Sequence, residues 1–174
     1  MAKKKTAGIV LPREALPEGI RLALDRSRVL LEAAAHLARS PHLTGAAVLF
    51  SQGVEELGKA AMLQDARVST SAPTVNVPGF LDHQVKLTKA AGLLSESALM
   101  LGGYFDAENY FDGDAYFGES PAEDWLVRLD LLYAGWDESR NEWRGYSQVN
   151  ADVVEANIRS VLALIAKKRS EWSD

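Results

Sequence analysis

Cysteine is absent from all 174 residues of the sequence. Disulfide bonds, thiolate nucleophiles and cysteine-ligated zinc sites are therefore excluded, and the fold must be held by packing alone. Long apolar runs are missing too, because no stretch approaches the roughly 18 consecutive apolar residues of a membrane-spanning helix. The apolar run in the basic start, MAKKKTAGIV, is too short for a signal peptide. These absences predict a cytoplasmic protein that does not enter a membrane.

Positive charge is also scarce. The chain has 19 Lys and Arg residues against 24 Asp and Glu residues, which gives a net charge of -5. This balance argues against a broad nucleic-acid-binding surface, so we expect no DNA partner, although a local basic patch is compatible with it. The sequence has no glycine-rich phosphate loop, and its acidic residues between 106 and 119 do not follow EF-hand spacing. We therefore expect neither a cofactor nor a metal site.

The six prolines fall at boundaries between periodic segments. Apolar periodicity and capping signals predict four long helices and one shorter one, over about 17–39, 45–67, 79–101, 121–135 and 150–172. No segment shows a convincing strand pattern. The prediction is an all-α, single-domain helical bundle of four long helices plus shorter helices, in which a disordered basic tail (1–14) precedes the domain (15–174).

Residues 53–63, GVEELGKAAML, are apolar on nearly every side of a helix, yet they carry Glu55, Glu56 and Lys59. A helix that is apolar nearly all round is usually central to its bundle, so these charges should be partly desolvated and should need partners. One lysine against two glutamates leaves a net acceptor, which calls for a cation from another helix. The alternative is an ordinary exposed salt bridge, and the pattern leaves both interpretations open.

Three stretches carry a family resemblance: EELGKA at 55–60, which lies within the stretch just described, HQVK at 83–86 and RLDLLYAGWD at 128–137. With the run from Arg28 to Leu63, they resemble the AbiV family of bacterial abortive-infection proteins, which belongs to the HEPN group of helical domains. The family's H-K-x-K lacks one lysine here, and Leu131 stands where glycine is usual. The resemblance covers most of the chain from 24 to 165 and implies a HEPN-like fold.

The resemblance also implies a role in limiting phage growth, by acting on RNA or on the translation machinery. Many HEPN domains are metal-independent endoribonucleases that use an Arg and a His separated by four to six residues, usually at a dimer interface. The corresponding residues here are Arg128 and Tyr133. Because the reference pKa of tyrosine is near 10, it is a poor general base at neutral pH. The sequence therefore leaves ribonuclease activity open.

His83 and Lys86 lie one helical turn apart and offer another candidate for the general base. In the functional hypothesis, His83 supplies the acid or base that Tyr133 cannot, while Arg128 and Lys86 hold a phosphate. The residues expected to organise or bind at this site are Glu55, Glu56, Lys59, Lys86 and Asp137. In the structural alternative, Lys86 or Arg128 is only the cation that the acidic residues need. Both hypotheses predict that these residues converge in space.

Two functions from different classes follow. The first is a cytoplasmic phage-defence protein that works as a homodimer, with RNA or a phage protein as its partner. The second is a non-catalytic protein-protein interaction module in which the buried charge cluster is structural. In that module the Tyr-Phe pairs of the segment 104–118 contact the partner protein.

Overall fold

The computed structural model describes residues 8–101, 135–137, 142–144 and 151–172. Its long helices are α1 (Leu16–Ala38), α2 (Leu43–Ser69), α3 (His83–Leu101) and α5 (Ala151–Trp172). The short elements are β1 (Ile9–Pro12), the 3-10 helix η1 (Arg13–Ala15), β2 (Thr74–Val77), β3 (Gly135–Asp137) and β4 (Glu142–Arg144). The predicted all-α bundle of four long helices is confirmed. The helix predicted to begin at 121 and the Tyr-Phe segment 104–118 lie outside the described residues.

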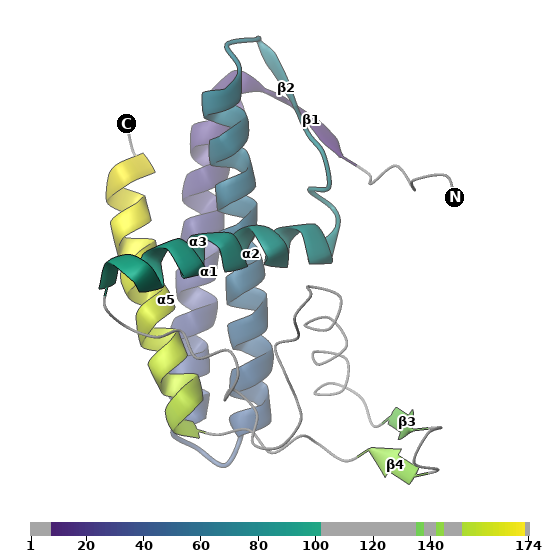
Figure 1. The fold of residues 1–174 in the computed structure, drawn as a ribbon, viewed down its shortest axis with the longest axis vertical. Coiled ribbons are helices and arrows are strands. Elements are labelled where there is room, and N and C mark those ends of the chain that lie inside the picture. Colours follow the sequence, from purple (N-terminus) through teal and green to yellow (C-terminus); the bar gives the residue numbers. More distant parts are fainter. Residues whose placement is uncertain (1–7, 102–134, 138–141, 145–150, 173–174) are drawn as a thin grey trace.

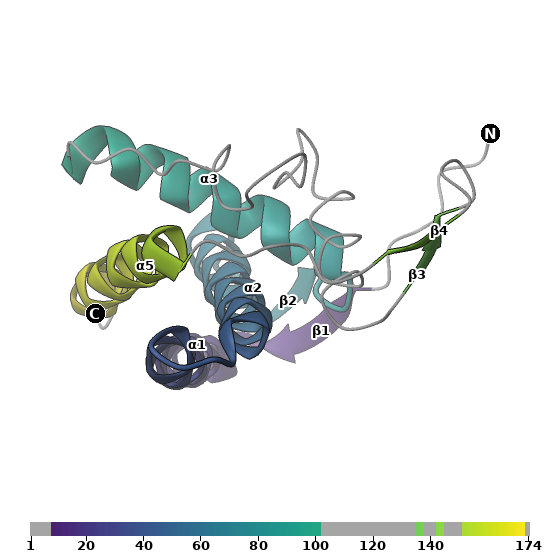
Figure 2. The same cartoon turned by 90° about the horizontal axis from the view of Figure 1, so that it is seen from below.

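The helices form a bundle of three roughly parallel axes with a fourth helix across them. α1 and α2 run antiparallel, α5 packs beside them, and α3 crosses α2 instead of running alongside it (Figures 1 and 2). None of the described helices combines the length and the apolar character that a membrane crossing requires. The crossing of α3 over α2 matters most for function, because it brings charged residues of both helices together.

The apolar stripe predicted on α1 is the face that packs on the bundle. Ile20, Leu24, Leu31 and Ala34 are all buried, whereas Arg21 and Arg28 form ion pairs on the surface. The helix ends at Ala38, one residue before the predicted end at about 39, and Pro41 follows shortly after it. α2 then begins at Leu43, two residues before the predicted start at about 45, and His42 is its N-cap residue.

α2 is the central helix, as its all-round apolar character predicts. It contacts α1, α3, α5 and β2. Phe50 and Leu57 are fully buried on it, and Ala and Gly residues at many other positions let the neighbouring helices approach closely.

A small antiparallel sheet, formed by β1 and β2, was not predicted. Ile9 pairs with Val77 and Pro12 with Thr74, and Val75 and Val77 bury their side chains under the sheet. For residues 8–14 this differs from the disordered tail expected at 1–14, and for 74–77 it differs from the expected absence of strands. The physical reason is a pairing between segments far apart in the chain, which lets each cover apolar side chains of the other. Residues 1–7 of that tail lie outside the described residues.

Two other local predictions are corrected. α3 begins at His83 instead of about Gly79, because Gly79 has a positive φ of 73° and the Asp82 carboxylate accepts the Gln84 N–H at 2.9 Å, which caps the helix there. Strands were also not expected at 135–137 and 142–144, where the backbone of β3 pairs with that of β4.

Candidate functional site

The site forms where α3 crosses the middle of α2, and a glycine makes the crossing possible. A Cβ atom on Gly58 would lie 2.0 Å from the Lys86 carbonyl oxygen, so only glycine permits this approach. The backbone of α3 therefore lies directly against α2. This contact places the first turn of α3 beside Glu55, which lies nearly one turn before Gly58 on α2.

Glu55 receives two partners from α3. Lys86 Nζ lies 2.7 Å from Oε1 of Glu55, and His83 Nδ1 lies 2.8 Å from Oε2. Glu55 and Lys86 are buried, with 6% and 3% of their surfaces exposed, whereas 46% of the His83 side chain is exposed. We call these three residues the Glu55 site. It has a buried end at Lys86 and an open end at His83.

Glu55 is held in its charged form. Burial by itself would raise its pKa, but the hydrogen bonds from Lys86 and His83 and the Coulomb interactions with both residues outweigh burial. Together they lower the pKa of Glu55 from the usual 4.5 to about 2. Glu55 is therefore a carboxylate at neutral pH, and it acts as a fixed hydrogen-bond acceptor for the His83 ring.

The contact with Glu55 determines which ring nitrogen of His83 carries the proton. A carboxylate can only accept, so Nδ1 of His83 must carry the proton of this hydrogen bond. In the neutral ring Nε2 is then the basic nitrogen, as in other carboxylate-histidine pairs. The exposed position of His83 at the start of α3 makes such a ring suitable for exchanging a proton with a bound molecule.

Glu56 and Lys59 form a second, separate pair on α2. Lys59 Nζ lies 2.5 Å from Oε1 of Glu56, and about a quarter of each side chain is exposed. Glu55 faces α3 and pairs there with Lys86. The predicted need for a cation from another helix is met by Lys86.

The predicted convergence is found for Glu55, His83 and Lys86. Lys86 does not fit the phosphate-holding role of the functional hypothesis, because its ammonium group is buried against Glu55. Arg128 and Tyr133 lie outside the described residues, and Asp137 is described only as a backbone position in β3. Within the described part of the chain, no three His, Asp or Glu side chains cluster in a way that could hold a metal ion.

Two residues that shape the site were not identified from the sequence. Gly58 allows the helix crossing, and Asp82 fixes the first turn of α3 and so the position of His83. A signal for Gly58 was present, since a glycine inside a helix is unfavourable unless a close contact needs it. For Asp82 the signal was an N-cap residue next to the HQVK motif.

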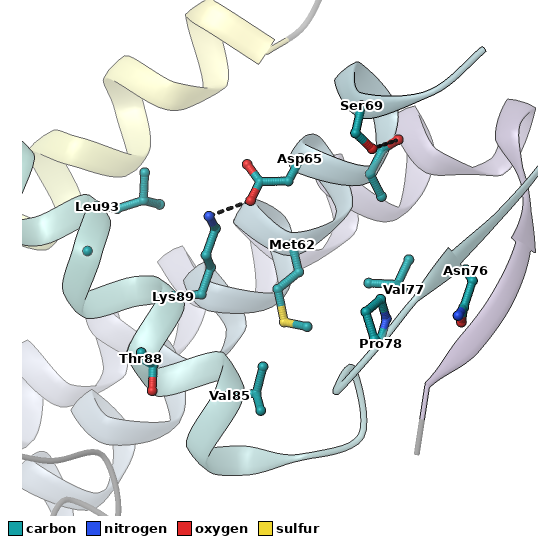
Figure 3. Close-up of a pocket in the computed structure, with 12 residues that line it drawn as sticks. Met62, Asp65, Ser69, Asn76, Val77, Pro78, Val85, Thr88, Lys89 and Leu93 are labelled. Carbon is teal, nitrogen blue, oxygen red and sulfur yellow. Dashed lines mark hydrogen bonds and ion pairs between the residues drawn. The ribbon is translucent and has the colours of Figure 1, made fainter. Parts of the chain in front are cut away.

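A pocket of about 730 Å³ opens between α2, α3 and β2 (Figure 3). Met62 and Val85 point toward one another within it, and at its edge Lys89 reaches from α3 to Asp65 of α2. None of the predicted site residues lines this pocket. Its two charged residues neutralise each other, so it offers no net charge for a charged ligand.

The comparisons with known proteins agree with this architecture. A family model for AbiV, in the HEPN group, matches residues 15–159, which include α1, α2, α3 and the whole Glu55 site. No curated protein and no solved structure gives a significant match. Because the family match spans far more than half of the sequence, the chain belongs to the AbiV family of HEPN-type abortive-infection proteins.

Proposed function

We propose that this AbiV-family protein limits phage growth by cleaving RNA, with His83 as the residue that accepts a proton from the substrate. One observation carries the proposal: an exposed imidazole whose Nδ1 is hydrogen-bonded to a buried carboxylate. The carboxylate fixes the orientation of the ring and keeps the proton on Nδ1, so that Nε2 is the nitrogen that accepts the substrate's proton. Tyr133 stands where many HEPN ribonucleases have the histidine that follows the motif arginine, so the reaction needs another base, and we assign this role to His83.

The proposed reaction needs no metal. His83 removes the proton of a ribose 2′-hydroxyl, and the 2′-oxygen attacks the neighbouring phosphorus. The bond from O2′ to phosphorus forms as the bond from phosphorus to O5′ breaks, and the 5′-oxygen takes a proton from solvent. Because DNA has no 2′-hydroxyl, this chemistry is restricted to RNA.

Each charged residue has a separate part in this proposal. Glu55 holds the His83 ring in place by accepting its Nδ1–H, and the low pKa of Glu55 means that it does not take the proton itself. Lys86 keeps the buried Glu55 in place. Arg128 and the partly exposed Lys59 contact the phosphate, since Lys86 is too deeply buried to do so.

Cleavage of a labelled RNA by the purified protein tests this proposal. His83→Ala should lower the cleavage rate by about 100-fold or more, the usual contribution of a general base. His36→Ala is the matched control, because His36 is an exposed histidine on α1, away from the Glu55 site. A substrate with 2′-deoxyribose at the cleaved position should remain intact. Equal cleavage by His83→Ala and wild type, or cleavage of the deoxy substrate, would contradict the proposal.

A second candidate function is a non-catalytic interaction module in which the Glu55 site only stabilises the fold. The burial of Lys86 and Glu55 against each other favours it, because a buried, paired ion pair can be purely structural. Under this proposal the partner is a phage protein, and wild type leaves RNA intact. His83→Ala would then keep its protection against phage as long as the protein stays folded.

We also propose that the protein acts as a homodimer. Family resemblance supports this proposal, and the exposed position of His83 would let a second copy lie close to the site. Light scattering coupled to size-exclusion chromatography should give about twice the 19.0 kDa mass of one chain. A mass of one chain at micromolar concentration would contradict it.

A further inference from the structure

A second group of charges lies at the end of the bundle where α1 begins and α2 and α5 end (Figure 1). Arg13 of η1 and Arg67 of the last turns of α2 line a pocket there of about 390 Å³, together with Pro17, Pro73 and Glu14. Arg67 follows Glu55 by 12 residues on α2, which is roughly 18 Å along the helix axis. The pocket is therefore separate from the Glu55 site.

Main-chain carbonyls hold both arginines in position. Arg13 Nη1 donates to the carbonyl oxygen of Arg67 at 2.8 Å and to that of Thr70, and Arg67 Nη1 donates to the carbonyl oxygen of Trp172 at 2.9 Å. These bonds satisfy carbonyls at the ends of α2 and α5. A guanidinium group has five N–H donors, so Nε and Nη2 of each arginine are not used by these bonds.

Neither of the two guanidinium groups forms an ion pair in the part of the chain that the structure describes. Arg21 and Arg28 each pair with a carboxylate on their own helix, whereas neither Arg13 nor Arg67 forms an ion pair with a described residue. Glu14 lines the same pocket but is exposed and pairs with neither. Two like charges fixed beside one pocket favour an anion that binds between them.

We propose that Arg13 and Arg67 bind the phosphate group of a small phosphorylated molecule. Guanidinium groups bind phosphate oxygens through paired N–H donors, and this geometry suits phosphate better than a spherical anion such as chloride. The N-terminus of α1, where Pro17 lies, adds a favourable helix dipole. The size of the pocket is within the range of small-molecule sites, and its two proline rings offer apolar surface to the organic part.

Thermal unfolding of the full chain with inorganic phosphate or AMP, at constant ionic strength set with chloride, tests this site. Both probes should raise the melting temperature in a saturable way. A tighter apparent Kd for AMP would identify a phosphate ester as the ligand, and equal values would identify free phosphate. The proposal would be overturned if neither probe raised the melting temperature, in a saturable way, above its value in chloride alone.

Variants assign the effect to the pocket. Arg67→Gln should abolish the shift, while Arg26→Gln should keep it, because Arg26 is an exposed arginine on α1 that does not line the pocket. Glu14→Gln changes only an exposed side chain and should tighten apparent binding by roughly threefold, as expected for removing one like charge from the rim of a solvated site. If Arg67→Gln fails to fold, Glu14→Gln decides alone. Unchanged binding by Glu14→Gln, or a full shift in a folded Arg67→Gln, would overturn the assignment.

Discussion

Replacing Glu55 by Gln tests how much the Glu55 site contributes to stability. The substitution keeps the size of the side chain but removes its charge, so the ammonium group of Lys86 is left buried without the carboxylate that faces it. Removing one partner of a buried ion pair is costly, because the remaining charge has lost its hydration and gains no compensating contact. We therefore expect Glu55→Gln to destabilise the fold strongly.

The pKa of Glu55 gives the magnitude. Lowering it from 4.5 to about 2 corresponds to about 3 kcal/mol of stabilisation of the charged form in the folded state. This agrees with the roughly 3–5 kcal/mol lost when one member of a buried pair is removed. For a chain of this length, about 3 kcal/mol should lower the melting temperature by roughly 6–12 °C.

Urea unfolding followed by far-UV circular dichroism measures this loss. Glu56→Gln is the matched control, since it makes the same chemical change in the adjacent residue. The pair that Glu56 forms with Lys59 is partly exposed, so its loss should cost less than about 1 kcal/mol. A second substitution, Lys86→Met in the Glu55→Gln background, should recover part of the loss because it removes the unpaired charge. Equal effects of Glu55→Gln and Glu56→Gln, or no recovery by Lys86→Met, would refute the reasoning.

Two further predictions concern the same crossing of α2 and α3. The folded-state pKa of Glu55 lies below its unfolded value, so its contribution is complete above about pH 4.5 and is lost as the pH falls towards 2. Between these pH values, the free energy of unfolding of wild type should therefore fall by about 3 kcal/mol more than that of Glu55→Gln; parallel pH curves would contradict this. Gly58→Ala should cost at least about 2 kcal/mol, because its Cβ would meet the Lys86 carbonyl oxygen and force α3 away. Gly92 lies on the other helix of the crossing, α3, and nothing lies within 4 Å of a Cβ built on it, so Gly92→Ala should be neutral or stabilise by up to about 1 kcal/mol in the same urea titration. A similar loss in both variants would show that the crossing is not tight.

The helices and the central place of α2 could be predicted because both depend on local patterns. Ile20, Leu24 and Leu31 repeat at helical spacing, and the apolar residues around Glu55 indicated a buried helix. The pairing of β1 with β2 could not be predicted in this way, because it joins residues more than sixty positions apart. The alternation of Thr74, Val75, Asn76 and Val77 was a local strand signal, but it is too short to stand out between prolines.

The candidate site was predicted in part for similar reasons. The excess of carboxylates in EELGKA indicated that a cation from elsewhere was needed, and Lys86 supplies it. The roles of the partners depend on burial, which the sequence does not specify: Lys86 is enclosed while His83, one turn earlier, is half-exposed. The crossing geometry set by Gly58 causes this difference, since it presses the Lys86 side of α3 against α2.

Phage plating on bacteria that express the protein tests the central claim most directly. Cells with wild type, His83→Ala or His36→Ala should be compared at equal protein levels, with a plasmid lacking the coding sequence as the reference. If His83 performs the reaction, wild type and His36→Ala should reduce plaque numbers to the same extent, and His83→Ala should give plaques at the reference level. Protection by a folded His83→Ala that equals wild type would contradict the account.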